Sequence, residues 1–374
     1  LREDASAEGY WLLGTATVAL SQQANDSANV GGVGQQEFER RSRWAEALLR
    51  DAVEALDGAL ALGRGSAEAW LARAEARGLL VEHRRHGAIL EILGGRRPPH
   101  DADPLTADLD AALADMRQAK AFGAHPEKVG RIFGYLAWEK GEIVRKTEPY
   151  RRRLTPRDEQ ESPFRAAVVR RAIGPLITEL ESLEPRYRSS ELLFRLGQLY
   201  ECWANSHPDD EADTRDDLRH AGSLFSEALD RNPGYAPAQK WRAITEYELA
   251  IEELEQGGLP LGHFRRAIVE FDAALVADPA EAWVRFWRGD CWMRLAEWSR
   301  VRGASGWDDY RRALEGLDPI SADAVPIVLH PRIWSRVLLF TEELSHGFDV
   351  SAEVVKARAD LGRLDFSRPE EAAW

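Results

Sequence analysis

Cysteine and methionine are scarce in this chain, with two of each among 374 residues. Two cysteines are too few for a disulfide framework. Cys202 and Cys291 each lie in an apolar, aromatic stretch, so we interpret both as small core residues rather than as a bridge or a reactive pair. Long apolar runs are also missing. No stretch reaches the roughly 18 to 20 apolar residues that a membrane-spanning helix needs, so we expect no membrane span.

Basic residues are outnumbered by acidic ones, 49 to 63, which gives a formal net charge of −14. Phosphate contacts need clustered Lys and Arg, so this balance argues against nucleic acid as the main partner. Residues 145–171 are locally basic, and we interpret them as a solvated loop and helix face; binding of an acidic or phosphorylated segment is the alternative. The first residue is Leu1 and not Met, so we expect a processed product or a fragment of a longer protein. We expect a cytoplasmic location.

Motifs of catalysis and cofactor binding are missing as well. The glycines of residues 31–34 lack both the preceding strand and the following Lys-Ser/Thr of a phosphate-binding loop, and there is no GxSxG motif. His83 and His86 have a spacing that metal ligands use, but no third ligand is marked and HExxH is absent. We therefore predict a non-catalytic chain without a metal ion or a cofactor.

What the chain does contain is one motif that occurs twice. Both copies read Ala-x3-Phe-x2-Ala-x4-Pro; the first begins at Ala221 and the second, displaced by 46 residues, at Ala267. Self-similarity at a fixed displacement is the signature of a repeat architecture.

Apolar residues recur at helical spacing along most of the chain, and no convincing alternating β stretch is present. Loops are expected at residues 25–36, 208–217 and 319–331, which are rich in glycine, acid or proline. The predicted helices span residues 5–23, 37–62, 66–93, 105–122, 127–147, 165–183, 190–205, 218–231, 236–256, 263–277, 282–301, 307–317, 333–344 and 352–364.

The repeated motif resembles the second helix of the tetratricopeptide repeat (TPR), which reads A-x3-F…P. Upstream of the first copy, Leu193, Leu196, Gly197 and Tyr200 match the first-helix pattern W-x2-L-G-x2-Y, with Leu in place of Trp. The resemblance implies an all-α fold, a right-handed superhelical solenoid of about seven antiparallel helix pairs.

Seven repeats follow when the small residue of each first helix is numbered position 8. A small side chain there lets paired helices approach closely. The residues at position 8 are Gly14, Ala74, Gly134, Gly197, Ala243, Gly289 and Ser335. The matching small residues of the second helices are Ala59, Ala119, Ser182, Ala228, Ala274 and Ala313.

We predict one continuous TPR-like domain over residues 1–374, with repeats at 7–66, 67–126, 127–189, 190–235, 236–281, 282–327 and 328–374. These repeats are longer than the 34 residues of the family. The extra length falls between the two helices of each repeat and is expected to lengthen them. The third repeat lacks the Ala-x3-Phe motif, because Pro175 and Glu179 occupy those places.

First helices of TPRs line the concave face, so the resemblance implies that positions 2, 5, 9 and 12 face a binding groove for a protein or peptide segment. Rings supply contact area at low entropy cost, and single charges fix the orientation of a ligand. The predicted groove residues are Lys128, Arg131, Tyr135, Trp138, Phe194, Gln198, Lys240, Tyr247, Trp283, Phe286, Asp290 and Met293. The alternative stays open that longer neighbouring helices cover the rings and make them core, since thirteen tryptophans must largely be buried.

The leading hypothesis is a non-catalytic protein- or peptide-binding scaffold or sensor segment of a larger bacterial protein or complex. The resemblance implies that an effector module, such as a kinase or protease, could lie on the same or a neighbouring chain. One alternative is an α-helical receptor or enzyme with a small-ligand pocket among Trp283, Trp287 and Trp292. Another is an architectural array that oligomerises through its terminal repeats.

Overall fold

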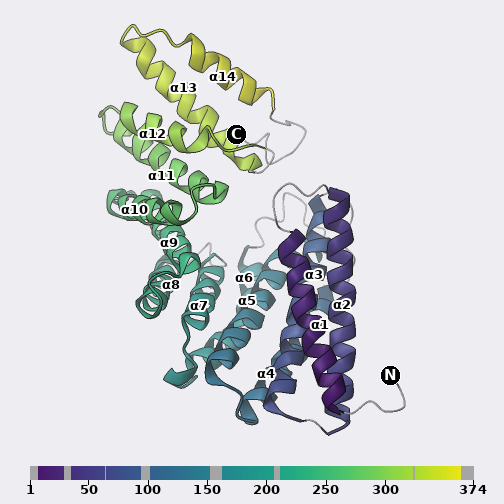
Figure 1. The fold of residues 1–374 in the computed structure, drawn as a ribbon. Helices are drawn as coiled ribbons and strands as arrows, with labels where there is room; N and C mark the ends of the chain where they lie inside the picture. Colours follow the sequence, from purple (N-terminus) through teal and green to yellow (C-terminus); the bar gives the residue numbers. More distant parts are fainter. Residues whose placement is uncertain are drawn as a thin grey trace. The chain divides into compact units, whose positions relative to one another are not determined.

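The computed structural model describes residues 7–28, 35–63, 65–93, 102–151, 162–205, 211–322 and 325–363. Within these ranges the chain forms helices joined by turns and contains no strand (Figure 1). The predicted all-α class is confirmed.

The chain divides into two compact units, Leu1–Asn232 and Pro233–Trp374. Each unit is described by itself. The helices of the first unit are α1 (Ala7–Ala28), α2 (Gln35–Ala61), α3 (Ala67–Leu93), α4 (Ala102–Ala121), α5 (Pro126–Arg151), α6 (Ser162–Glu181), the short 3-10 helix η2 (Pro185–Tyr187), α7 (Ser190–Ala204) and α8 (Glu211–Arg231).

The second unit follows the same plan of alternating helices. Its elements are α9 (Ala236–Glu255), α10 (Leu261–Ala277), α11 (Ala282–Val301), α12 (Trp307–Leu317), the 3-10 helix η3 (Pro326–Val328), α13 (Leu329–Ser345) and α14 (Ser351–Leu361).

Helices that follow one another pack against one another within each unit. The pairs run from α1 with α2 to α13 with α14, and the first helices α3, α5 and α7, like α9, α11 and α13, also touch in sequence order. This is the arrangement of a helical solenoid, in which each pair buries its apolar face on its neighbours. The seven predicted helix pairs are confirmed. That both units form one continuous domain with a right-handed superhelical path stays a prediction.

Position 8 is buried in all seven pairs, as close helix packing requires. A methyl group built on Gly197 would lie 2.5 Å from Cε1 of Phe225 in the paired helix. One built on Gly289 would lie 2.6 Å from Cγ of Leu317, and Gly14 approaches α2 just as closely. The repeated motif fills the space opposite, since the rings of Phe225 and Phe271 are wholly buried.

The third pair departs from this plan. A methyl group on Gly134 would meet Arg195 and Leu192 of α7, not a residue of its own partner α6. Ser182, expected as the small packing residue of the second helix, is exposed beyond the end of α6. The missing Ala-x3-Phe motif explains the difference, because α6 carries the exposed Pro175 where the other second helices have a packing residue.

Several predicted boundaries move. Of the acidic loop predicted at residues 208–217, residues 208–210 lie outside the described residues and the rest is helical from Glu211, where carboxylates suit the positive end of a helix dipole. Helix α13 begins at Leu329 and not at residue 333, since Pro331 falls in the first turn, where no N–H is needed for the helix. Helix α1 continues to Ala28, and the rest of the loop predicted at residues 25–36 before α2 lies outside the described residues.

Left-handed glycines end several helices. In the second unit, the turns at residues 256–260, 302–306 and 346–350 each have five residues with such a glycine second: Gly257, Gly303 and Gly347, with φ between 70° and 81°. Each turn closes with a pair of backbone hydrogen bonds, for example from the N–H of Gly303 to Arg300 and from that of Ala304 to Ser299. This is a Schellman motif, which favours glycine because only glycine adopts positive φ without strain.

Candidate functional site

The predicted groove residues all lie on first helices, α5 and α7 in the first unit and α9 and α11 in the second. Their exposure differs widely. Lys128, Arg131 and Trp283 are exposed, whereas Tyr135, Trp138 and Lys240 are half-buried. The remaining six are buried: Phe194, Gln198, Tyr247, Phe286, Asp290 and Met293. All twelve stay predictions as binding residues, but the buried six offer a partner almost no surface, in line with the core alternative.

Several predicted residues instead tie neighbouring first helices together in the first unit. Arg131 of α5 donates to Oε1 of Glu75 in α3 over 3.0 Å. One turn further on, the Tyr135 hydroxyl donates to Oε2 of Glu82 in α3 over 2.5 Å. These polar links fix the lateral spacing of α3 and α5, so they have a structural role whether or not a ligand binds.

Trp138 lies between two arginines. The guanidinium carbon of Arg195 in α7 is 4.7 Å from the ring centroid, and that of Arg85 in α3 is 5.9 Å away. Arg85 also makes a bidentate pair with the buried Glu139, with distances of 2.9 and 3.1 Å. Burial raises the pKa of Glu139 to about 7, although Arg85 opposes this shift. The ring of Trp138 is thus already engaged by the protein's own cations.

The second unit repeats the lateral links. Lys240 of α9 pairs with Glu281, the N-cap residue of α11, at 2.9 Å, and the Tyr247 hydroxyl donates to Oδ2 of Asp290 in α11 over 2.5 Å. Burial raises the pKa of Asp290, while the nearby Arg294 opposes the shift. Tyrosine-to-carboxylate links therefore join first helices in both units.

Six residues of α11 lie in a line along one side of this helix. We call the side of the second unit to which they belong, formed by the first helices α9, α11 and α13, its first-helix side. At about 100° per residue, all six lie within about 40° of Trp283 around the helix axis. We call them the α11 stripe: Trp283, Trp287, Asp290, Arg294, Glu297 and Val301. The ends of the stripe reach solvent, since Trp283 is 43% and Val301 80% exposed.

The same angular count explains the burial of two predicted residues. Phe286 and Met293 lie about 60° to 80° from Trp283 around α11, so they point into the core shared with α12 and α13. Sequence reasoning gave Trp287 only to the small-ligand pocket and missed Arg294 and Glu297, because it took fixed TPR positions. A count of about 100° per residue from Trp283 would have placed all three on the same side of the helix.

Trp334 of α13 extends the line beyond α11. Its indole Nε1 donates to Oε1 of Glu297, and the residue is 46% exposed. Glu297 Oε2 lies 3.8 Å from Arg294, which in turn lies 3.6 Å from Asp290. A chain of polar groups thus runs across the second unit from Trp334 on α13 to Tyr247 on α9. No sequence pattern pointed to Trp334, because it occupies a position that the TPR resemblance does not assign to the groove.

The three tryptophans of the small-ligand alternative do not converge. Trp287 and Trp292 are about 140° apart around α11. The Trp287 ring centroid lies 5.0 Å from that of Tyr247 on α9, whereas Trp292 lies under Arg312 of α12 at 4.7 Å. The placement of these rings gives no support to a shared pocket with Trp283.

A recurrent contact in both units is an arginine guanidinium over a tryptophan ring. The guanidinium carbon lies 4.2 to 4.7 Å from the ring centroid in five such pairs, formed by Arg73 on Trp70, Arg195 on Trp138, Arg312 on Trp292, Arg302 on Trp298 and Arg311 on Trp307. Across the described ranges, the exposed residues Trp44, Trp283 and Trp334 carry no such cation.

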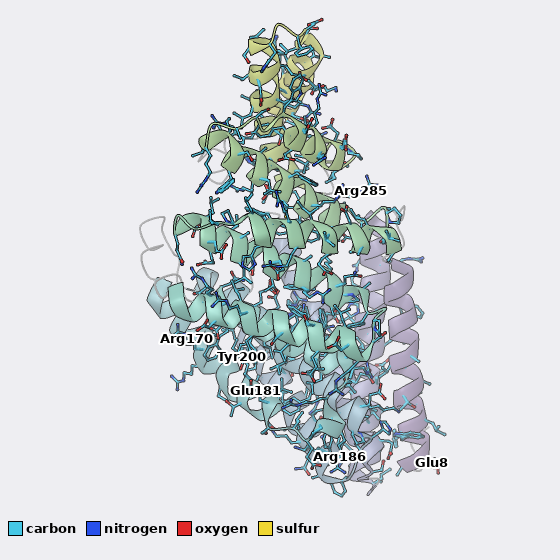
Figure 2. All side chains as sticks on the ribbon, turned by 90° about the vertical axis from the view of Figure 1, so that its left-hand side faces the viewer. Glu8, Arg170, Glu181, Arg186, Tyr200 and Arg285 are labelled. Carbon is cyan, nitrogen blue, oxygen red and sulfur yellow. The ribbon has the colours of Figure 1, made fainter. Side chains whose placement is uncertain are left out.

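Other polar clusters hold helices together. The Tyr200 hydroxyl of α7 donates to Oε1 of Glu181 in α6 over 2.5 Å (Figure 2), and His220 of α8 lies 3.7 Å from the same carboxylate. Among the residues that the structure describes, no three His, Cys, Asp or Glu side chains are grouped to hold a metal ion. None of the described helices combines the length and the apolar character that crossing a membrane requires.

Comparison with known proteins finds similar structures but no match by sequence. No family model matches the chain, and no curated protein matches it. The nuclear import adaptor Nro1 of S. pombe is similar in structure, with a TM-score of 0.51 at 13% identity over 86% of this chain and 99% of that one. A second structure of Nro1 gives a TM-score of 0.47 at 13% identity, covering 86% and 96%. The yeast protein Tom70 matches with a TM-score of 0.22 at 13% identity, covering 91% and 69%. At this identity, the likeness to Nro1 concerns the fold alone. The paired, stacked helices of this chain, with a small buried residue at position 8, form a TPR-like helical repeat.

Proposed function

We propose that this chain is a non-catalytic scaffold that binds a protein or peptide segment on the first-helix side of its second unit. The observation that carries the proposal is the solvent exposure of two tryptophans that the α11 stripe connects: Trp283 at its start, and Trp334, whose indole donates to Glu297 of the stripe. Large rings are costly to leave in water, and exposed aromatic residues are typical of binding surfaces.

The surroundings of these rings support the proposal. Trp334 is held by its hydrogen bond to Glu297, and Trp283 packs edge-on against Phe286 at 6.0 Å between ring centroids. The lateral links from Lys240 and Tyr247 hold α9 against α11. A surface whose rings are already oriented loses little entropy on binding. Nro1, which is described as a nuclear import adaptor, has a similar fold and is in keeping with such a role.

Site-specific photocrosslinking tests the proposal. A benzoylphenylalanine placed at Val301, at the end of the α11 stripe, should give covalent adducts with a partner protein in an extract of the source cells. Val276 is the matched control, because it is 84% exposed and lies on the second helix α10. Equal labelling at both positions, or none at Val301, would overturn the proposal.

The wider context of the scaffold is part of the same proposal. We propose that it acts as a sensor or regulatory segment of a larger bacterial protein or complex, with an effector module on the same or a neighbouring chain. Its cytoplasmic location stays a prediction, and so does the exclusion of nucleic acid partners, which is based on the acidic balance of the sequence.

A further inference from the structure

The described tryptophans of this chain differ in whether an arginine side chain lies over the ring. Five of them have an arginine guanidinium over the ring, supplied by the same helix or by a neighbouring one. Cations are attracted to the negative face of an indole ring. Trp283 and Trp334 are exposed to a similar degree, are connected through the α11 stripe by the Trp334–Glu297 hydrogen bond, and lack such a cation among the described residues.

We infer that Trp283 and Trp334 receive arginine or lysine side chains of a basic peptide segment. This inference rests on the proposed function and adds the chemistry of the partner. The intramolecular pairs, such as Arg312 on Trp292 at 4.7 Å, are the template for the contacts that the partner makes.

A carboxylate lies beside the ring of Trp334. Glu281, two residues before Trp283, is already engaged by Lys240 and by the backbone N–H of Val284. Glu297 accepts from the Trp334 indole through Oε1, while its Oε2 is 3.8 Å from Arg294, beyond hydrogen-bonding distance. A partner cation over the Trp334 ring would therefore find a carboxylate oxygen with capacity for another hydrogen bond.

The balance of charges on this side favours a basic partner over an acidic one. Lys240 is neutralised by Glu281, and Arg294 lies between the two carboxylates of Asp290 and Glu297. The chain as a whole carries a formal net charge of −14, which steers basic segments toward it. An acidic peptide would be repelled by the whole chain and would find no cation over either exposed ring.

The geometry sets the spacing of the basic residues. Trp283 and Glu297 are separated by fourteen residues of α11, which is about 21 Å along the helix. An extended peptide covers about 3.3 to 3.6 Å per residue, so two basic side chains about six residues apart would reach both rings.

Fluorescence anisotropy with defined peptides tests the inference on the full chain. The probe is a labelled peptide with two arginines six residues apart in a Gly/Ser/Ala background, at low salt. Two further peptides replace both arginines with glutamine or with glutamate. We expect saturable binding of the arginine peptide and at least about tenfold weaker binding of the other two, from two exposed cation–π contacts and the adjacent charge.

Variants of the protein connect binding to the two rings. The double variant Trp283→Ala/Trp334→Ala should bind the arginine peptide about tenfold more weakly, whereas Trp283→Phe/Trp334→Phe, which keeps aromatic faces, should restore part of the loss. Trp44→Ala is the matched control and should bind as the unmodified chain does. Trp44 is 54% exposed and also lacks a cation over its ring, but it lies on α2 of the first unit.

The inference falls if the glutamine or glutamate peptide binds as well as the arginine peptide, if the double variant binds normally, or if no peptide binds up to about 1 mM. Crosslinking at Val301 distinguishes failure of this inference from failure of the proposed function. Adducts at Val301 together with a negative peptide result would mean a partner of different chemistry. The absence of both would overturn the scaffold proposal as well.

Discussion

Replacing Asp360 by Asn should release helix α14 from the second unit. Asp360 accepts hydrogen bonds from Nε and Nη2 of Arg332, at 2.9 and 2.6 Å, and from Nη1 of Arg336 at 2.5 Å. All three side chains are buried. Ala357 is the only other buried residue of α14, so the helix is held mainly through this charged cluster.

The expected magnitude follows from the partners that remain. Removing one partner of a buried ion pair costs about 3 to 5 kcal/mol, because the other charge is left without compensation. Arg336 keeps Asp318 at 2.5 Å and Glu353 at 3.3 Å, and Arg332 keeps the carbonyl oxygen of Ile320 at 3.0 Å. The lower end of the range applies, so we expect a loss of about 3 kcal/mol in the local stability of α14.

Amide hydrogen exchange is the appropriate assay, because a chain of two compact units need not unfold in one step. A loss of about 3 kcal/mol corresponds to roughly a hundredfold faster exchange of amides in α14, whereas α10 should be unchanged. Lys356→Ala, which removes an exposed pair with Glu353 on the same helix, is the control and should change α14 by less than about 0.5 kcal/mol. Unchanged protection of α14 in the Asp360→Asn variant would show that the cluster does not hold the helix, and the reasoning would be wrong.

Two further predictions concern the first unit and the chain's small residues. Gly197→Ala should destabilise the α7–α8 pair by about 1 to 3 kcal/mol, because the new methyl group would meet Phe225. Gly262→Ala is the control: the nearest atom is 3.5 Å away, so this change should leave the stability unchanged or raise it. Urea denaturation measures both, and equal effects of the two changes would refute the packing argument. Arg85→Met should cost about 1.4 kcal/mol more at pH 8 than at pH 5, because pH 8 lies about one unit above the pKa of Glu139 and each unit corresponds to about 1.4 kcal/mol. The pKa of Glu139 lies at about 7, above its ordinary 4.5, so its stabilising contribution is complete below about pH 4.5 and is lost as the pH rises through about 7, where the carboxylate is charged and needs Arg85. The double variant Arg85→Met/Glu139→Gln should lose this pH dependence, and a pH-independent Arg85→Met would contradict the assignment.

Much of the fold could be predicted because its signals are local. Apolar spacing and flanking turns placed α11 and α12 at their observed bounds, and the position-8 residues predicted where helices approach most closely. Both depend on side chains within one helix or one pair. The partner of Gly134 could not be predicted in this way, because it depends on which neighbouring helix stacks nearest, and that helix is α7.

The candidate site was less predictable, for geometric reasons. A rotation of about 60° to 80° around α11 separates Trp283, which reaches solvent, from Phe286 and Met293, which do not. Groove positions numbered for a 34-residue repeat do not predict the direction of a side chain to within about 60° when the helix pairs are longer than in that repeat. The links from Tyr135 to Glu82 and from Tyr247 to Asp290 depend on how far one helix is shifted along its neighbour, a quantity that no sequence spacing contains.

The left-handed glycines have a consequence for rearranging this chain. In the second unit they lie inside the helix pairs, as at Gly257 and Gly303, whereas in the first unit Gly63 and Gly123 lie between one pair and the next. A single pair from the second unit thus carries its own sharp reversal and could be transplanted or duplicated as a module. A pair cut from the first unit would leave Gly63 or Gly123 at the junction with the next pair. Recombination of these repeats would therefore need different cutting points in the two halves of the chain.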